Sequence, residues 1–402
     1  DNNSGDISAA DVRNNLINMT DSLLFNSGSQ SITGSLTVTG SNGTINGLFF
    51  GRGNGNVSTN ILRQLYKKDT ELTFFPIGDN VEISAFDRIK KDFVDYLQNS
   101  TNKRFETINK NTPCLKLWHI FGSESRFSKN QSLYTFHETS DLTKIEKNLL
   151  KTRDLIFVSS DYTKKIFDIN GIENVVHAPL GFDDDFFITN KEYLPNKIHF
   201  GLMGKFEYRK NTSRIIKAWL KLFGNKPEYQ LSCVVNNSFL DKSKFQIEIT
   251  KILDGKHYNN INFIPPLKTN SEVNDYLNSI DIDLGGLSGA EGWNLPSFNA
   301  TALGKWSVVI NATAHKDWAT KDNSILIEPS RMKDAHDGIF FNKGHEFNQG
   351  QFFDISDEEM ENIILSSLSY AKTPNPEGLK LQQTMNYEKT VDIILSAIKS
   401  QM

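Results

Sequence analysis

The chain has 402 residues, more than one compact core usually holds, so its length predicts two domains and an appendage. Its formal net charge of −4 provides no general attraction to nucleic acid or to anionic membranes. No apolar run is long enough to span a bilayer, and no signal peptide is recognisable. Cys114 and Cys233 lie in apolar runs and are predicted to be buried free thiols, as in a reducing compartment. We therefore expect a cytoplasmic protein, in the host cell if the protein is viral.

Residues 1–45 differ in composition from the rest of the chain. An amphipathic pattern in their first half predicts one helix. Their second half alternates small polar and aliphatic residues with glycines, which favours short strands and turns. We interpret residues 1–45 as an N-terminal extension. Its repetitive half resembles β-rich segments of phage structural proteins, and a flexible leader is an equally good interpretation.

From residue 46, strand-like apolar runs alternate with amphipathic helix patterns. The predicted strands are residues 48–50, 71–77, 115–121, 132–136 and 155–158. The predicted helices are residues 57–67, 85–97, 141–150 and 161–169. Strands that alternate with helices predict a parallel sheet with right-handed crossovers. The glycine-rich loop at residues 51–55 follows the first strand and lacks the Gly-Lys-Ser/Thr ending of a Walker A loop.

A second series of the same kind begins with a predicted strand near residue 198. Its other predicted strands are residues 230–235, 261–264, 282–284 and 308–310, and two helices close the chain at residues 357–370 and 387–399. Residues 181–196 between the series read as an interdomain connection, with Asp183-Asp184-Asp185 as an exposed acidic run. The predicted fold class is α/β, with two doubly wound, Rossmann-like domains at residues 46–195 and 196–402 that face a cleft. We expect the last helix, at residues 384–400, to pack back on the N-terminal domain.

The most informative segment runs from Glu291 to Ala300 and reads Glu-Gly-Trp-Asn-Leu-Pro-Ser-Phe-Asn-Ala. An acidic residue enters a glycine-containing turn, and a Leu-Pro pair opens a short helix of small residues. Such a loop brings backbone N–H groups up to a ligand and points a helix N-terminus at an anion.

Two further segments contain charged or titratable residues at the ends of predicted strands. Gly204-Lys205 and Lys210 follow the first strand of the second series. His137 ends an apolar strand in the first series and is followed by Glu138. His119 is an alternative cleft histidine, which we interpret as structural.

Together these blocks resemble the retaining, nucleotide-sugar-dependent glycosyltransferases of the GT-B fold, of the family-4 type. In that family the donor loop reads Glu-Gly-Phe-Gly-Leu-Pro-x-x-Glu-Ala, and Asn299 here stands in place of the second Glu. The family's phosphate loop reads Gly-Arg-x-x-x-x-Lys-Gly, so Lys205 replaces its Arg and Lys210 aligns with its Lys. The pair His137-Glu138 matches a His-Glu or His-Asp of the family, and Pro179-Leu180-Gly181 matches its Pro-Leu-Gly.

The resemblance implies a glycosyltransferase of the hexosyltransferase type that works without a metal or another cofactor. It would move a sugar with retention from a nucleotide diphosphate sugar, for which we expect UDP, to a hydroxyl group. The implied catalytic residues are His137, Lys205, Lys210 and Glu291. The implied residues that bind the donor or its nucleotide are Gly53, Asn54, Gly204, Trp293, Asn294, Leu295 and Asn299. Asn299 brings no charge to the family's ribose-binding position, which predicts weaker nucleotide affinity.

The acceptor would bind in the N-terminal domain as a glycan, lipid or protein that the sequence does not identify. A homo-oligomer is compatible with the sequence. No His-x-x-x-His or Cys-x-x-Cys spacing predicts a zinc site. No concentrated basic stripe indicates nucleic acid as a partner. Two other classes stay open: a glycosyltransferase-like binding module that has lost catalysis, and a virion-associated protein that modifies glycans or is structural.

Overall fold

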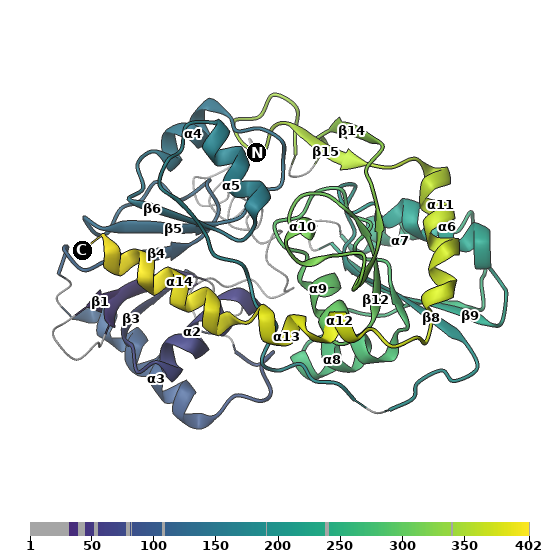
Figure 1. The fold of residues 1–402 in the computed structure, drawn as a ribbon, viewed down its shortest axis with the longest axis horizontal. Coiled ribbons are helices and arrows are strands. Elements are labelled where there is room, and N and C mark those ends of the chain that lie inside the picture. Colours follow the sequence, from purple (N-terminus) through teal and green to yellow (C-terminus); the bar gives the residue numbers. More distant parts are fainter. Residues whose placement is uncertain are drawn as a thin grey trace, which may run out of the picture.

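The computed structural model describes residues 32–38, 45–51, 55–77, 81, 83–106, 109–189, 191–237, 241–338 and 341–401. Within these ranges two α/β lobes lie side by side, and the last helix of the chain crosses from the second lobe to the first (Figure 1). No helix of the described ranges is long and apolar enough to cross a membrane. The helix predicted in the first half of residues 1–45 lies outside the described residues.

The N-terminal lobe is built on a seven-stranded sheet with the order β1-β3-β2-β4-β5-β6-β7. Its strands are β1 (Ile32–Val38), β2 (Ile45–Gly51), β3 (Glu71–Pro76), β4 (Cys114–Leu117), β5 (Gln131–Thr135), β6 (Leu155–Val158) and β7 (Val175–His177). All are parallel except β1, which pairs antiparallel with β2 and β3. Because β3 and β4 lie on opposite sides of β2, the strand order changes direction at β2, which is where sheets of this kind bind ligands.

The helices of this lobe are α2 (Asn56–Lys67), α3 (Lys91–Asn102), α4 (Lys144–Leu150) and α5 (Asp161–Ile169), with a short 3-10 turn, η1 (Lys103–Phe105). Helix α2 buries Val57, Ile61 and Leu65, which repeat every four residues and therefore share one face. The helix predicted at residues 85–97 begins only at Lys91. Residues 85–90 stay out of it, and the Ala85 carbonyl oxygen accepts a hydrogen bond from Asn270 N at 2.7 Å.

The C-terminal lobe has a six-stranded parallel sheet with the order β10-β9-β8-β11-β12-β13. Its strands are β8 (Ile198–Lys205), β9 (Tyr229–Asn236), β10 (Ile261–Phe263), β11 (Ile282–Asp283), β12 (Trp306–Ile310) and β13 (Ser324–Ile327). Strands β9 and β11 flank β8 on its two sides, so a second crevice lies beyond the carboxyl ends of β8 and β11. The predicted α/β fold class with two doubly wound sheets is confirmed.

The helical segments of the C-terminal lobe are α6 (Thr212–Phe223), α7 (Lys242–Ile252), α8 (Asn270–Ser279), α9 (Leu295–Ala302), α10 (His315–Trp318), α11 (Asp357–Ser366), η2 (Ser367–Tyr370), α12 (Pro376–Leu379) and α13 (Leu381–Thr384). A hairpin of β14 (Arg331–Asp334) and β15 (Gln351–Asp354) was not predicted. It reaches the N-terminal lobe, because Gln351 N donates to Ser140 Oγ at 2.9 Å and Ser140 N donates to Gln351 O at 3.2 Å.

The last helix, α14 (Tyr387–Ser400), lies on the N-terminal lobe (Figure 1). Its buried residues Val391 and Ile394 join the apolar cluster that contains Ile61 and Leu65 of α2. Gly181, where the chain leaves the N-terminal lobe, lies against the start of α14. A Cβ placed on Gly181 would lie 2.1 Å from Tyr387 N. Glycine is therefore required at this crossing.

The acidic run between the lobes differs from its predicted exposure. Asp183 and Asp185 are each only 3% exposed. Asp183 Oδ2 accepts a hydrogen bond from Asn60 Nδ2 at 2.8 Å, and Asp185 Oδ1 pairs with Arg63 Nη2 at 2.8 Å. Asp185 Oδ2 also accepts from Asn270 Nδ2 at 2.8 Å. The prediction of an exposed run was wrong for these two residues, because donors from both lobes compensate their burial.

Candidate functional site

The site lies where loops at the carboxyl ends of β5, β8 and β11 meet between the lobes. The two lobes touch at this point, because Ser159 Oγ of the N-terminal lobe donates to the Gly292 carbonyl oxygen at 2.5 Å. A Cβ on Gly292 would lie 3.0 Å from Phe136 Cβ. The glycine of the predicted donor loop thus permits the N-terminal lobe to approach closely.

The loop after β8 places a lysine in the centre of the site. Gly204 has a φ of +155° and a Cβ there would lie 3.3 Å from Lys210 Cδ, so the side chain of Lys210 folds back over this glycine. Lys210 is 6% exposed, and its Nζ lies 2.5 Å from Glu291 Oε1. The two residues that the sequence predicted separately therefore form one buried ion pair.

Glu291 is held by both its backbone and its carboxylate. Its N–H donates to Thr313 Oγ1 at 3.1 Å. Burial by itself would raise the pKa of Glu291, but Lys210 and then Arg209 outweigh this effect and lower the pKa to about 2. Glu291 is therefore a carboxylate at neutral pH and can accept hydrogen bonds from sugar hydroxyls.

Arg209 contacts carboxylates from three segments of the chain. The sequence analysis did not name it as a site residue. Its Nη1 lies 3.2 Å from Glu138 Oε1 and 3.3 Å from Glu291 Oε2, and its Nη2 lies 3.2 Å from Glu207 Oε2. Nη1 also donates to the Ala290 carbonyl oxygen. Arg209, Glu138 and Glu207 are at most 8% exposed. Arg209, Lys210 and these acids, with Glu291, form what we call the charge cluster, which spans both lobes.

The charge cluster changes the protonation of its members. Burial lowers the pKa of an arginine, but the three carboxylates, Glu138 first, together hold the pKa of Arg209 above its usual value. Burial raises the pKa of Glu138 to about 7, although Arg209 opposes the change. Glu138 therefore titrates near neutral pH while Arg209 keeps its charge.

His137 does not join the charge cluster in the described structure. Its Nε2 lies 3.1 Å from Thr139 Oγ1, and its ring centroid lies 5.7 Å from that of Phe167 in α5. Successive side chains of an extended segment point to opposite sides, so Glu138 faces Arg209 while His137 faces its own lobe. Burial lowers the pKa of His137.

Asn294 directly precedes α9, and its side chain contacts the neighbouring loops. Asn294 has a left-handed φ of +66°. Its Nδ2 lies within hydrogen-bond distance of the Gly285 carbonyl oxygen and of His315 Nε2, both at 3.0 Å. Burial lowers the pKa of His315 to about 4, so a neutral imidazole accepts this bond. Trp293 is 3% exposed and packs edge-on against Phe298.

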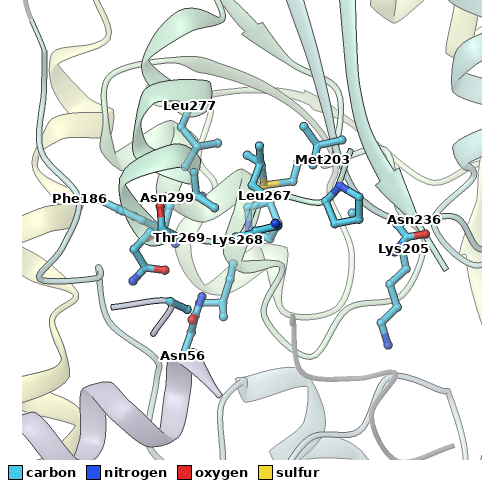
Figure 2. Close-up of a pocket in the computed structure, with 18 residues that line it drawn as sticks. Asn56, Phe186, Met203, Lys205, Asn236, Leu267, Lys268, Thr269, Leu277 and Asn299 are labelled. Atoms are coloured by element: carbon cyan, nitrogen blue, oxygen red, sulfur yellow. The ribbon is translucent and has the colours of Figure 1, made fainter. Parts of the chain in front are cut away.

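A cavity of about 140 Å³ opens beside the carboxyl end of β8, between the lobes. Its walls are mostly apolar and include Met203, Val234, Pro266, Leu267, Val273 and Leu277. Leu295 and Pro296 bring the N-terminus of α9 to the cavity, and Asn56 belongs to the N-terminal lobe. Figure 2 shows Asn56 reaching towards the residues of the C-terminal lobe. Among the described residues that line the cavity, none is acidic.

Two amides in the cavity have an unused acceptor. Asn299 is 4% exposed, and its Oδ1 has no hydrogen-bond partner in the structure. Asn56 Oδ1 is likewise buried without a partner. Buried carbonyl oxygens are normally satisfied, so both amides are suited to hydroxyl or N–H donors of an occupant. The sequence analysis identified Asn299 and missed Asn56, which directly follows the glycine-rich loop.

Two lysines, Lys205 and Lys268, also line the cavity. Burial, together with the nearby Arg209 and Lys210, lowers the pKa of Lys205 to about 7, with Glu207 opposing the change. An anion in the cavity would favour its protonated form.

Gly53 and Asn54 lie outside the described residues. Gly204 and Leu295 line the cavity together with Asn299. No group of three or more His, Cys, Asp or Glu side chains that could hold a metal ion occurs in the part of the chain that the structure describes. Cys114 and Cys233 are free and buried, as predicted.

Solved structures with a similar architecture include a sucrose-phosphate synthase and an O-GlcNAc transferase. Sucrose-phosphate synthase from Thermosynechococcus elongatus matches with a TM-score of 0.55 and 12% identity, over 79% of this chain and 82% of that chain. Anabaena HepE in complex with UDP-glucose matches with a TM-score of 0.50 and 14% identity, over 67% and 72%.

The pneumococcal O-GlcNAc transferase GtfA, in complex with UDP and GlcNAc, matches with a TM-score of 0.53 and 12% identity. The match covers 77% of this chain and 59% of GtfA. Neither a protein-family model nor a curated protein sequence matches the chain. At these identities the similarities establish the fold, which is GT-B, as the sequence predicted.

Proposed function

We propose that the chain transfers a sugar from a nucleotide diphosphate sugar, specifically a UDP-sugar, to a hydroxyl acceptor with retention of configuration. The observation that carries this proposal is the interlobe cavity, because it combines apolar walls, two unused amide acceptors and Lys205 next to the Lys210–Glu291 pair. A nucleotide supplies a flat base for the walls, ribose hydroxyls for the amides and a diphosphate for the lysine.

We propose that different residues contact the base, the ribose and the diphosphate. The base would lie against Val234 and Leu267, and a ribose hydroxyl would donate to Asn299 Oδ1. The diphosphate would lie near Lys205 and the N-terminus of α9, which places the donor sugar towards Glu291. In this arrangement Lys205 and Lys210 neutralise the leaving group, and we propose that the enzyme requires no metal.

The proposed reaction breaks the bond between the sugar's anomeric carbon and the β-phosphate oxygen. The acceptor oxygen bonds to the same carbon on the same face, and its proton moves to the departing phosphate. The protein orients the reactants and stabilises the leaving charge. The UDP-containing structures of HepE and GtfA support the choice of donor, since they share this fold.

The proposal is tested with a thermal-shift panel of UDP, GDP, ADP, CMP and their common sugar conjugates without added metal. We expect UDP and one of its conjugates to raise the melting temperature by mass action. Val273 lines the cavity, so the larger side chain of Val273→Trp would fill the cavity and should abolish the shift in melting temperature. Ile247→Trp is the control, because Ile247 is 53% exposed, and this variant should keep the shift. A panel without any shift would overturn the proposal. A shift without subsequent sugar transfer would favour the binding-module alternative.

The affinity for UDP should depend on pH through Lys205. Its lowered pKa of about 7 means that the cation which attracts the diphosphate is present below pH 7 and is lost as the pH rises through 7. The dissociation constant should therefore rise by up to about tenfold per pH unit above pH 7. Calorimetry between pH 6 and 9 measures this dependence.

Lys205→Arg is the matched control for the pH prediction. An arginine stays charged throughout this range, so the variant should lose the part of the pH dependence that Lys205 causes. Titration of UDP itself would appear in both proteins. An unchanged pH slope in Lys205→Met would assign the dependence to another group.

A further inference from the structure

Within the charge cluster, Glu291 contacts a second cation besides Lys210. Glu291 Oε1 already has Lys210 Nζ at 2.5 Å, yet Arg209 Nη1 lies 3.3 Å from Glu291 Oε2. A carboxylate that is held at both oxygens by two different cations cannot rotate or shift without breaking one of these contacts. Glu291 is thus fixed in orientation as well as in charge.

Arg209 is itself anchored on two sides. Glu207 binds Nη2 from the same loop at 3.2 Å, and Glu138 of the N-terminal lobe lies 3.2 Å from Nη1. The same Nη1 donates to the carbonyl oxygen of Ala290, the residue before Glu291. The planar guanidinium therefore contacts the donor loop at two consecutive residues while it holds the facing lobe.

We propose that Arg209 is a positioning residue that fixes Glu291 and Ala290 of the donor loop when Glu138 of the N-terminal lobe closes on it. In this proposal, closure of the lobes also places Glu291. The consequence for turnover rests on the proposed function, but the placement of the loop does not. Arg209 does not line the cavity, so a variant that keeps its positive charge should change nucleotide affinity little.

Two charge-conserving variants test the role of Arg209. Arg209→Lys keeps the positive charge but loses the fork that spans several oxygens. Arg214→Lys is the matched control, because Arg214 Nη1 lies 2.6 Å from Asp354 and its Nε lies 2.7 Å from Asp357, all within the C-terminal lobe. Measured quantities are the UDP dissociation constant, the rate of UDP release from UDP-glucose, and hydrogen exchange of residues 287–294.

We expect Arg209→Lys to lower kcat for UDP release by about 10- to 100-fold, as misplacement of a reacting group does. The UDP dissociation constant should stay within about threefold of the unmodified protein, and exchange at residues 287–294 should become faster. Arg214→Lys should change none of the three. An unchanged kcat and exchange rate in Arg209→Lys, or an equal loss in Arg214→Lys, would overturn the proposal. Faster exchange in a protein that never binds UDP would sustain the positioning role and reject the proposed function.

Two further variants test whether the contact between Arg209 and Glu138 of the facing lobe matters. Glu138→Gln and Glu207→Gln each remove one carboxylate from the same guanidinium and leave two acids and two bases in the charge cluster. Neither variant therefore creates an uncompensated charge, and both should fold even if Arg209→Lys does not. Glu138→Gln should reduce kcat and speed exchange at residues 287–294 more than Glu207→Gln. Unchanged kcat and exchange in Glu138→Gln would show that Arg209 is anchored within its own lobe alone, and would overturn the interlobe part of the proposal.

Discussion

Lys210→Met should lower turnover of a UDP-sugar by about 10²- to 10³-fold, the usual cost of removing one group that stabilises a developing charge. Lys210 Nζ lies 2.5 Å from Glu291 and near the cavity proposed for the diphosphate, so it is suited to neutralise the leaving phosphate. Initial rates of UDP release, with the UDP dissociation constant measured alongside, separate this effect from weaker binding.

Removal of Lys210 also affects stability, and the experiment must separate the two effects. Loss of one partner of a buried ion pair typically costs about 3–5 kcal/mol, because the other charge remains buried. Arg209 limits this cost, since it keeps a contact to Glu291 at 3.3 Å. The double variant Lys210→Met with Glu291→Gln removes the pair together and should regain stability without regaining turnover.

Lys305→Met provides a control of the same chemistry elsewhere in the C-terminal lobe. Lys305 is half-buried, and its Nζ donates to the Asn278 carbonyl oxygen at 2.6 Å, outside the site. Turnover should be unchanged in this variant. Full turnover in Lys210→Met would refute the role assigned to Lys210.

Asn299→Glu should tighten UDP binding about five- to tenfold. Hydrogen bonds to a charged acceptor contribute about 1 kcal/mol more than those to a neutral one, and Asn299 Oδ1 is buried in the cavity without a partner. The same change should lower the melting temperature of the protein without nucleotide, because it buries a carboxylate in a mostly apolar cavity. Calorimetry and thermal unfolding of one preparation measure both effects.

Asn299→Gln separates the effect of the glutamate's charge on UDP binding from the effect of its longer side chain. Glutamine has the length of glutamate and no charge, so it should not tighten binding. Weaker UDP binding in Asn299→Glu would mean that residue 299 does not face the ribose, and the alignment of the donor loop would then be incorrect.

The predicted elements were most accurate where one local pattern decided the structure. The spacing of Val57, Ile61 and Leu65 predicted α2, and the order of strands and helices predicted both parallel sheets. The predicted start of α3 was wrong. Ala85 contacts the facing lobe, and a local sequence pattern does not reveal a contact with a distant segment. The β14–β15 hairpin was missed for the same reason: it is a long excursion whose partner, Ser140, lies in the other lobe.

The candidate site divides in a similar way. Lys205, Lys210, Glu291 and Asn299 were named from the sequence, and the structure brings them to one region between the lobes. Their roles in transfer remain proposals. His137 was named from the same blocks, but its ring lies against Phe167. Strand alternation indicates that His137 and Glu138 face opposite sides, but it does not indicate which one faces the cleft.

The sequence by itself determined the α/β class, the two sheets and the loops that end beside the cleft, because periodicity and glycine placement act over a few residues. Only the tertiary structure decided the burial of Asp183 and Asp185 and the contacts of Arg209 with Glu138 and Glu291. The physical reason is that a buried charge is stable only beside its partners. Those partners come from distant segments, such as Asn60, which is 123 residues from Asp183, and some of them, such as Glu138 and Arg209, meet only when the lobes pack together.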